Sequence, residues 1–295
     1  MQDSLTRFSI DNSNITGALV QLTQSHHEMT TQQGDQSDYP LYVQHLLAEM
    51  ATVALFMASN LKVAGRLTLQ LYGSGHLYSA FVEVELCQQT IDTGSERAIR
   101  GLARRHETQV PMSLDLRDWL GDQARLAITV QPNKGRPYQG ITPIEQPRFS
   151  QCIEDYYQRS EQLPTQLWIQ QDRQRCAALF LQSLPERKTV APALLWQEAL
   201  LYAQTLKPDE LLQYTPMILL ERLFNEYRLR VHSATPVAYR CSCTEQRSEA
   251  ALVALGPKEL KAMAAEQATV TLDCQFCSKH YTFAIDTLLA TLDKQ

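Results

Sequence analysis

The sequence lacks the features that mark exported, membrane-spanning and nucleic-acid-binding proteins. Residues 1–10 contain no basic stretch followed by an apolar one, and no apolar run approaches the roughly 18 residues that a membrane span requires. The formal net charge is −5, so the chain has no general attraction to phosphate backbones. We therefore expect a soluble, cytoplasmic protein whose partners include neither a membrane nor a nucleic acid.

Signatures of catalysis and of nucleotide binding are also missing. The seven histidines show no spacing that is typical of a catalytic set. Gly73-Ser74-Gly75 begins like a dinucleotide-binding fingerprint, but Tyr78 stands where the third glycine belongs, and no Gly-Lys-Ser/Thr follows. We interpret these glycines as a hairpin turn and expect that the protein is not an enzyme.

Basic residues form one cluster, made of Arg97, Arg100, Arg104 and Arg105. On a strand, Arg100 and Arg104 share a face. No aromatic residues are interleaved with them, as they would be in a typical surface for single-stranded nucleic acid. We therefore interpret the cluster as a solvated face of a sheet rather than as an anion site.

The apolar content of 44% in 295 residues is ample for a globular core and favours one larger domain with one or two smaller units. Residues 40–60 are apolar nearly all round, which predicts a buried helix. Residues 150–160 predict another helix, with Ser150 as its cap. Strands are predicted at residues 66–72, 77–86, 97–103, 124–131, 138–141, 166–170 and 176–182. Together these elements predict an α+β fold with a mixed or antiparallel sheet, the N-terminal domain spanning residues 1–183.

A polar stretch at residues 183–192 with two prolines marks the expected domain boundary. Three helical stretches follow, so residues 184–234 are predicted to form a helical linker, and residues 235–295 a small C-terminal domain of short strands and helices. The linker helices carry apolar residues that need a partner: Leu194, Leu195, Trp196, Leu200, Leu219, Leu220, Leu223 and Phe224.

Four of the seven cysteines lie in the C-terminal domain, as Cys241-Ser242-Cys243 and, 30 residues later, Cys274-Gln275-Phe276-Cys277. Two close pairs of thiols supply the four soft ligands that zinc takes in a structural site, and the same sulfurs can also form two disulfides. His280 is a weaker alternative ligand, because four thiols already complete the site. The remaining cysteines, Cys87, Cys152 and Cys176, are isolated, and we expect them to be small buried hydrophobes.

The spacing of the two pairs does not match the common zinc or thiol-redox motifs. A zinc ribbon has two Cys-X-X-Cys pairs about 15 to 20 residues apart, whereas the first pair here is Cys-X-Cys and the gap is longer. A thioredoxin-like use of Cys274 and Cys277 requires a helix N-terminus, and the flanking residues predict strands.

The pattern of Cys241, Cys243, Cys274 and Cys277 at the end of a 33.5 kDa acidic chain resembles the 33-kDa heat-shock protein family of redox-regulated holdase chaperones. Further segments are similar to the N-terminal domain of that family, so the resemblance covers essentially the whole chain. These are residues 47–49 with the following helix, 66–75, 138–140, 155–157 and 160–165. Pro137 and the short segment 170–175 depart from the family pattern, away from the cysteines.

The resemblance implies a mechanism. In the reduced, inactive form, Cys241, Cys243, Cys274 and Cys277 bind one zinc per chain, and this stabilises a domain whose own core is marginal. Oxidation forms the disulfides Cys241–Cys243 and Cys274–Cys277, releases zinc and unfolds the domain.

The helical linker then loosens, and its apolar residues hold unfolding client proteins. The family works without ATP, is active as a dimer and passes its clients to ATP-driven refolding chaperones. A zinc-containing thiol oxidoreductase that uses Cys274 or Cys277 is the alternative function, and a zinc-dependent regulator of nucleic acid is a weaker one.

Overall fold

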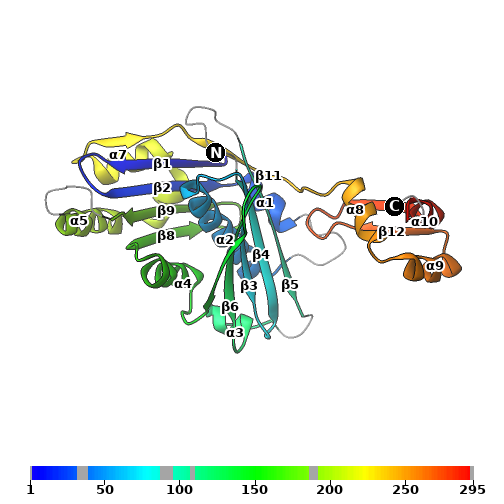
Figure 1. The fold of residues 1–295 in the computed structure, drawn as a ribbon. Coiled ribbons are helices and arrows are strands. Elements are labelled where there is room, and N and C mark those ends of the chain that lie inside the picture. Colours follow the sequence, from blue (N-terminus) through cyan, green and yellow to red (C-terminus); the bar gives the residue numbers. More distant parts are fainter. Residues whose placement is uncertain (1, 32–38, 87–95, 107–109, 186–191, 293–295) are drawn as a thin grey trace. The chain divides into compact units, whose positions relative to one another are not determined.

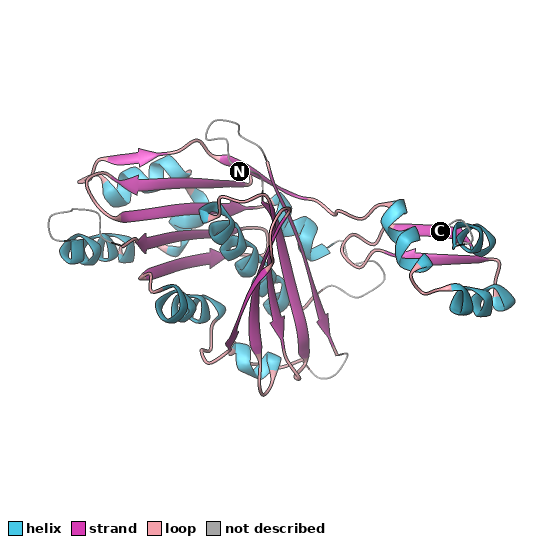
Figure 2. Ribbon diagram, viewed as in Figure 1, coloured by secondary structure: helices cyan, strands magenta, loops and turns pink. Residues whose placement is uncertain are grey.

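The computed structural model describes residues 2–31, 39–86, 96–106, 110–185 and 192–292. They divide into two compact units, the first ending at Tyr239 and the second beginning at Arg240 (Figure 1). Helices and a mixed sheet build the first unit, and helices with a small hairpin build the second (Figure 2). The predicted α+β fold class is therefore confirmed.

Eleven strands form the sheet of the first unit, ten of them in the order β7-β6-β3-β4-β5-β11-β1-β2-β9-β8, with β10 also pairing with β1. Every pair is antiparallel except β11 with β5. The strands are β1 (Ser4–Ile10), β2 (Ile15–Leu22), β3 (Gly65–Tyr72), β4 (Leu77–Leu86), β5 (Arg97–Arg105), β6 (Arg125–Pro132), β7 (Tyr138–Pro143), β8 (Thr165–Gln171), β9 (Cys176–Ser183), β10 (Leu229–Val231) and β11 (Thr235–Tyr239).

Helix α2 (Leu41–Asn60) forms the centre of the main core. It packs against β3, β4 and β5 and also against β2 and β9, so it touches both halves of the sheet. By length and composition α2 is apolar enough to cross a membrane, and 72% of its most apolar window is buried inside the protein. Its apolar character is therefore explained by its position in the core, as predicted for residues 40–60.

Shorter helices cover the remaining edges of this core: α1 (Gln24–Thr31), α3 (Leu116–Leu120) and α4 (Phe149–Tyr156), which continues as a π-helix, η1 (Tyr157–Glu161). The predicted cap at Ser150 is wrong, because α4 begins one residue earlier and Ser150 lies in its first turn. The backbone N–H of Ser150 instead donates to the carboxylate of Glu49 on α2, at 3.0 Å. A residue 101 positions away therefore satisfies this helix end, which no local pattern reveals.

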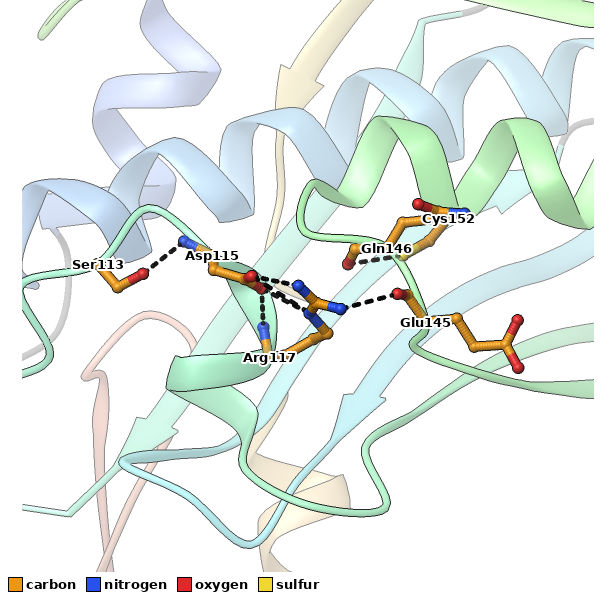
Figure 3. A network of polar contacts seen from close by, with 6 residues as sticks. All are labelled: Ser113, Asp115, Arg117, Glu145, Gln146 and Cys152. Atoms are coloured by element: carbon orange, nitrogen blue, oxygen red, sulfur yellow. Dashed lines mark hydrogen bonds and ion pairs between the residues drawn. The ribbon is translucent and has the colours of Figure 1, made fainter.

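Polar contacts link α3 to the segment before α4, and Cys152 on α4 contacts the same segment (Figure 3). Asp115 caps α3 by accepting from the backbone of Arg117 at 2.9 Å, and the Arg117 guanidinium binds both Asp115 and the carbonyl of Glu145. The next carbonyl, of Gln146, accepts from the Cys152 thiol at 3.6 Å. Burial raises the pKa of Cys152 to about 11, so this cysteine is the inert core residue that the sequence predicts.

Helices α5 (Pro192–Gln204), α6 (Pro208–Gln213) and α7 (Pro216–Phe224) form a layer over the other face of β1, β2 and β9. A second core lies beneath them, built from residues of the helices and of these strands: Phe8, Ile10, Ile15, Leu19, Leu179, Leu181, Ala199, Leu211, Leu219, Leu220, Leu223 and Phe224. Phe8 and Phe224 meet at its centre with ring centroids 5.8 Å apart. The apolar faces of the predicted linker are thus partnered by the sheet.

The second unit consists of α8 (Glu245–Val253), α9 (Pro257–Glu266), β12 (Thr269–Asp273), β13 (His280–Ala284) and α10 (Ile285–Leu292). Strands β12 and β13 form an antiparallel hairpin. The core cluster of this unit is small in the part of the chain that the structure describes: Leu252, Val253, Leu260, Val270, Ile285 and Leu288. So small a core is marginal by itself and gains from a cross-link.

Five elements were not predicted from the sequence: β1, β2, α1, α3 and α10. Burial is nearly continuous along β2, because one face packs on the main core and the other on the helical layer. Strand β1 also contributes to both cores, with Leu5 in the main core and Phe8 and Ile10 under the helical layer. The division at residues 183 and 234 stays a prediction. Strand β11 belongs to the sheet of the first unit, where Val237 pairs with Arg97 and Thr235 with Leu5.

Candidate metal centre

The four cysteines that the sequence singles out come together in the second unit. Their Sγ atoms all lie within 4.8 Å of one another, and each side chain is half-buried. Within the described residues, no other group of three or more His, Cys, Asp or Glu side chains is arranged to hold a metal ion. Cys241, Cys243, Cys274 and Cys277 are therefore the candidate ligands.

The geometry of the cluster fits a tetrahedral metal ion. The Sγ atoms of Cys241 and Cys274 are 3.4 Å apart, and those of Cys243 and Cys277 are 3.5 Å apart. Four sulfurs at the usual Zn–S distance of about 2.3 Å have neighbours about 3.8 Å apart, so a small expansion of this cluster suffices. The donor set is also the right chemistry, since soft thiolates select zinc over hard cations such as calcium.

Along the chain, the first cysteine pair lies between β11 and the capped helix α8. Strand β11 ends two residues before Cys241, and the hydroxyl of Thr244 caps α8 by accepting from the backbone of Arg247 at 3.2 Å. The Arg247 guanidinium donates back to the carbonyl of Ser242 at 2.7 Å. The residue between the two cysteines is therefore anchored, and both thiols point to the same side of the loop.

The second pair lies in the tight turn of the β12–β13 hairpin. The backbone of Ser278 donates to the carbonyl of Cys274 at 2.8 Å, and the backbone of Cys274 donates to Lys279 at 2.9 Å. Ser278 closes the turn in the left-handed region, at φ 55°. These bonds fold the chain back within four residues and bring Cys277 beside Cys274. The prediction that strands flank Cys274 and Cys277 is confirmed.

Tyr281 contacts the cluster from β13. Its hydroxyl donates to the Sγ of Cys243 at 3.2 Å, and the side chain is 7% exposed. Burial raises the pKa of Cys243, but the hydrogen bonds from Tyr281 and the neighbouring thiols outweigh it, and the pKa falls to about 7. Burial also raises the pKa of Cys241 and of Cys277. One thiol of the cluster is thus prepared to be a thiolate near neutral pH.

His280 is not brought into the cluster. Its Nδ1 lies 2.6 Å from a carboxylate oxygen of Asp273, the residue directly opposite on β12, and its side chain is 70% exposed. The sequence alternative in which His280 replaces a cysteine has no support in this arrangement.

Two features bear on the other predicted roles of cysteine. Cys274 follows a strand, and the next element is another strand, so it lacks the helix N-terminus that activates a thioredoxin-like thiol. Cys176 is fully buried on β9 and burial raises its pKa well above the usual value, as expected for an inert thiol. Cys87 lies outside the described residues.

The residues predicted to hold clients are mostly enclosed in this conformation. Leu219, Leu220, Leu223 and Phe224 are at most 2% exposed in the second core. Leu195 and Trp196 are partly buried against that core, and Leu194 is 60% exposed.

Sequence reasoning missed three exposed apolar side chains on the same helices. They are Leu201, Met217 and Ile218. The sequence signal was present, since each is a large apolar residue in a predicted helix, but only packing tells which side faces water. It also missed Tyr281, which lies four positions after Cys277 in the hairpin.

Comparison with known proteins agrees along the whole chain. The family model described as Hsp33 protein matches residues 3–284. The chain is 34% identical over 287 residues to the 33 kDa chaperonin of Ectopseudomonas mendocina, covering 96% of this chain and 92% of that protein. It is 35% identical over 285 residues to the 33 kDa chaperonin of Pseudomonas savastanoi pv. phaseolicola, covering 95% and 90% respectively.

A solved structure has a similar fold. The crystal structure of the 33 kDa chaperonin from Thermotoga maritima superimposes with a TM-score of 0.80, covering 99% of this chain and 100% of that one. The sequence identity in this comparison is 17%, so it supports the fold alone.

Proposed function

The chain belongs to the Hsp33 family of chaperones, and we propose that it is a redox-regulated, ATP-independent holdase of the cytoplasm. In the reduced form it is inactive and holds one zinc ion per chain. Under oxidative stress it binds unfolding proteins and keeps them from aggregating. The observation that supports this proposal best is the cluster of four thiols within 4.8 Å in a unit with a very small apolar core.

Zinc supplies a cross-link between the loop after β11 and the β12–β13 turn, and binding of this kind contributes about 10–16 kcal/mol of apparent folding free energy to small zinc domains. Cys241, Cys243, Cys274 and Cys277 are its ligands. A unit whose core cluster contains six buried apolar side chains depends on this contribution to stay folded. Tyr281 and Arg247 orient the ligands from outside the cluster.

Oxidation removes the ligands. When peroxide converts Cys241 with Cys243 and Cys274 with Cys277 into disulfides, each pair of thiolates gives up two electrons. Each peroxide takes up these electrons with two protons and becomes two water molecules. A disulfide sulfur has no negative charge to hold zinc, so the cross-link is lost and the second unit unfolds.

Unfolding of the second unit affects the first unit through the chain that connects them. Strand β11 is short and joins the two halves of the sheet, pairing over three residues with β5 and over two with β1. It runs directly into Cys241, so unfolding of the second unit frees one of its ends. We propose that residues 184–234 then loosen. Strands β10 and β11 directly follow the helical layer along the chain, so loss of β11 from the sheet frees the C-terminal end of that layer.

Release of the helical layer supplies the apolar surface that binds clients. Leu219, Leu220, Leu223 and Phe224 would be uncovered together with the sheet residues beneath them, such as Phe8. Leu194, Leu195 and Trp196 extend the same surface. The oxidised protein acts as a dimer, and reduction returns clients to ATP-driven refolding chaperones.

The test compares the reduced, zinc-loaded protein with the peroxide-treated protein, using light scattering of a heat-unfolded client. We expect protection by the oxidised form only, with one zinc released and four thiols lost per chain in the same titration. Equal protection by the two forms would overturn the switch. Zinc release without loss of thiols would overturn the proposal that oxidation of the thiols releases the zinc.

A further inference from the structure

Four basic side chains lie on one face of the sheet where β1 meets β10 and β11. The backbone of His232 donates to the carbonyl of Arg7 at 2.9 Å, and Arg230 lies opposite Ser9 on the neighbouring pair. Residues opposite each other on paired strands share a face, so Arg7, His232 and Arg230 point to the same side. The pairings of Val237 with Arg97 and of Thr235 with Leu5 place Arg97 on this face as well.

The positive charges are not balanced by the protein. Among the described residues, no carboxylate lies within 4.0 Å of the half-buried Arg7 guanidinium, and it makes no hydrogen bond. Burial and the charge of Arg97 both lower the pKa of Arg7, which means that both disfavour its charged form. Like charges on neighbouring strands destabilise a sheet unless an anion lies between them.

One carboxylate, that of Asp11, is shared between Arg230 of this cluster and Arg228 outside it. Asp11 lies 3.5 Å from the guanidinium of Arg228 and 3.9 Å from that of Arg230. Both arginines are largely exposed, at 89% and 71%, so these pairs are loose. Asp11 is the only acidic residue among the described residues that line the adjoining cavity.

The cavity has a volume of about 390 Å³ and is lined by Arg7, Arg230 and His232. Ser9 and Thr16 lie opposite each other on β1 and β2 and add two hydroxyl groups to the wall. Burial, together with Arg7 and Arg230, lowers the pKa of His232, so its imidazole can donate from a neutral ring. Cationic forks with hydroxyl donors around them are the groups that recognise phosphate oxygens.

We propose that this cavity is a binding site for a phosphate-class oxyanion, held between the guanidinium groups of Arg7 and Arg230 with His232 and Ser9 as further donors. The volume exceeds that of one orthophosphate ion, so a chain of phosphoryl groups fits as well. The site differs from the basic cluster recognised in the sequence, since only Arg97 belongs to both. Because β10 is the strand before β11, a bound anion would stabilise the segment that leads to the metal centre.

Isothermal titration tests the site with the reduced, zinc-loaded, full-length protein. Orthophosphate and tripolyphosphate are the probes, each at constant ionic strength set with chloride. We expect one site on the wild type for at least one probe, and the stronger of the two identifies the source of the phosphate groups. Arg7→Gln should weaken binding by about tenfold or more, because a charge-assisted pair is lost. Arg136→Gln, the same change at an exposed position, should not alter it.

Two further variants keep the test decisive if Arg7→Gln does not fold. Arg230→Gln changes a side chain that is 71% exposed and should also weaken binding, whereas Arg7→Lys keeps the charge but loses the fork and should give an intermediate value. The proposal is overturned if the wild type binds neither probe at millimolar concentration. It is equally overturned if the Arg7 and Arg230 variants bind like Arg136→Gln.

Discussion

Removal of the Tyr281 hydroxyl tests how the protein controls its metal ligands. Tyr281 donates to the Sγ of Cys243 at 3.2 Å, and its ring is packed beneath the Lys279 ammonium, 5.1 Å from the ring centroid. Substitution Tyr281→Phe keeps the ring and this contact and deletes one hydrogen bond. The change therefore acts on Cys243 and leaves the hairpin in place.

The size of the effect follows from the strength of that bond. A hydrogen bond to a charged group contributes about 1.5–3 kcal/mol, and we take the lower end because sulfur is a weak acceptor. About 1.4 kcal/mol corresponds to tenfold in an equilibrium constant, so zinc should bind about tenfold more weakly. This agrees with the range of about 10- to 100-fold that is typical for groups bonded to metal ligands.

The assay is a competition titration of the reduced protein with a chromophoric zinc chelator at constant pH. Tyr227→Phe is the matched control, because the hydroxyl of Tyr227 donates to Glu198 at 2.9 Å in the first unit. It should bind zinc like the wild type. A thiolate without its hydrogen bond is also more nucleophilic, so Tyr281→Phe should release zinc faster under peroxide. An affinity equal to that of the control would refute the proposed role of the hydroxyl.

Three further outcomes follow from the buried groups. Phe224→Ala empties the centre of the second core and should cost about 3–5 kcal/mol in urea unfolding, with apolar-dye binding by the reduced protein; unchanged dye binding would contradict the role of this layer. Burial raises the pKa of Glu49 to about 7, so the folded state retains a proton that the unfolded chain loses above about pH 4.3. Stability should therefore fall as pH rises from about 4.5 to 7, and Glu49→Gln should flatten the urea midpoint over that range. Cys152 and Cys176 should resist alkylation in the native reduced protein and react only after denaturation, as a thiol count in both conditions would show.

The elements predicted correctly are those whose burial follows one simple rule. Strands β3 and β4 alternate because one face meets α2 and the other faces outward, so residues 66–72 and 77–86 were recognised. Strand β2 was missed because both of its faces are covered, which removes the alternation. The cap of α4 was misplaced for a related reason, since the group that satisfies Ser150 comes from another helix.

The four candidate metal ligands can be predicted from the sequence alone. The spacings Cys241-X-Cys243 and Cys274-X-X-Cys277 are short enough that backbone geometry alone keeps each pair of thiols together. The sequence also predicted the strands and turns that carry them, because hydrophobic alternation and turn residues act over a few positions.

The surroundings of these four cysteines depend on tertiary packing. The contact of Tyr281 with Cys243 and the place of β11 between β5 and β1 join residues that are far apart along the chain, with Leu5 pairing Thr235. The same holds for the unbalanced charge of Arg7, which depends on the face that three strands share. Such pairings are set by which surfaces exclude water together, and no local pattern in the sequence contains that information.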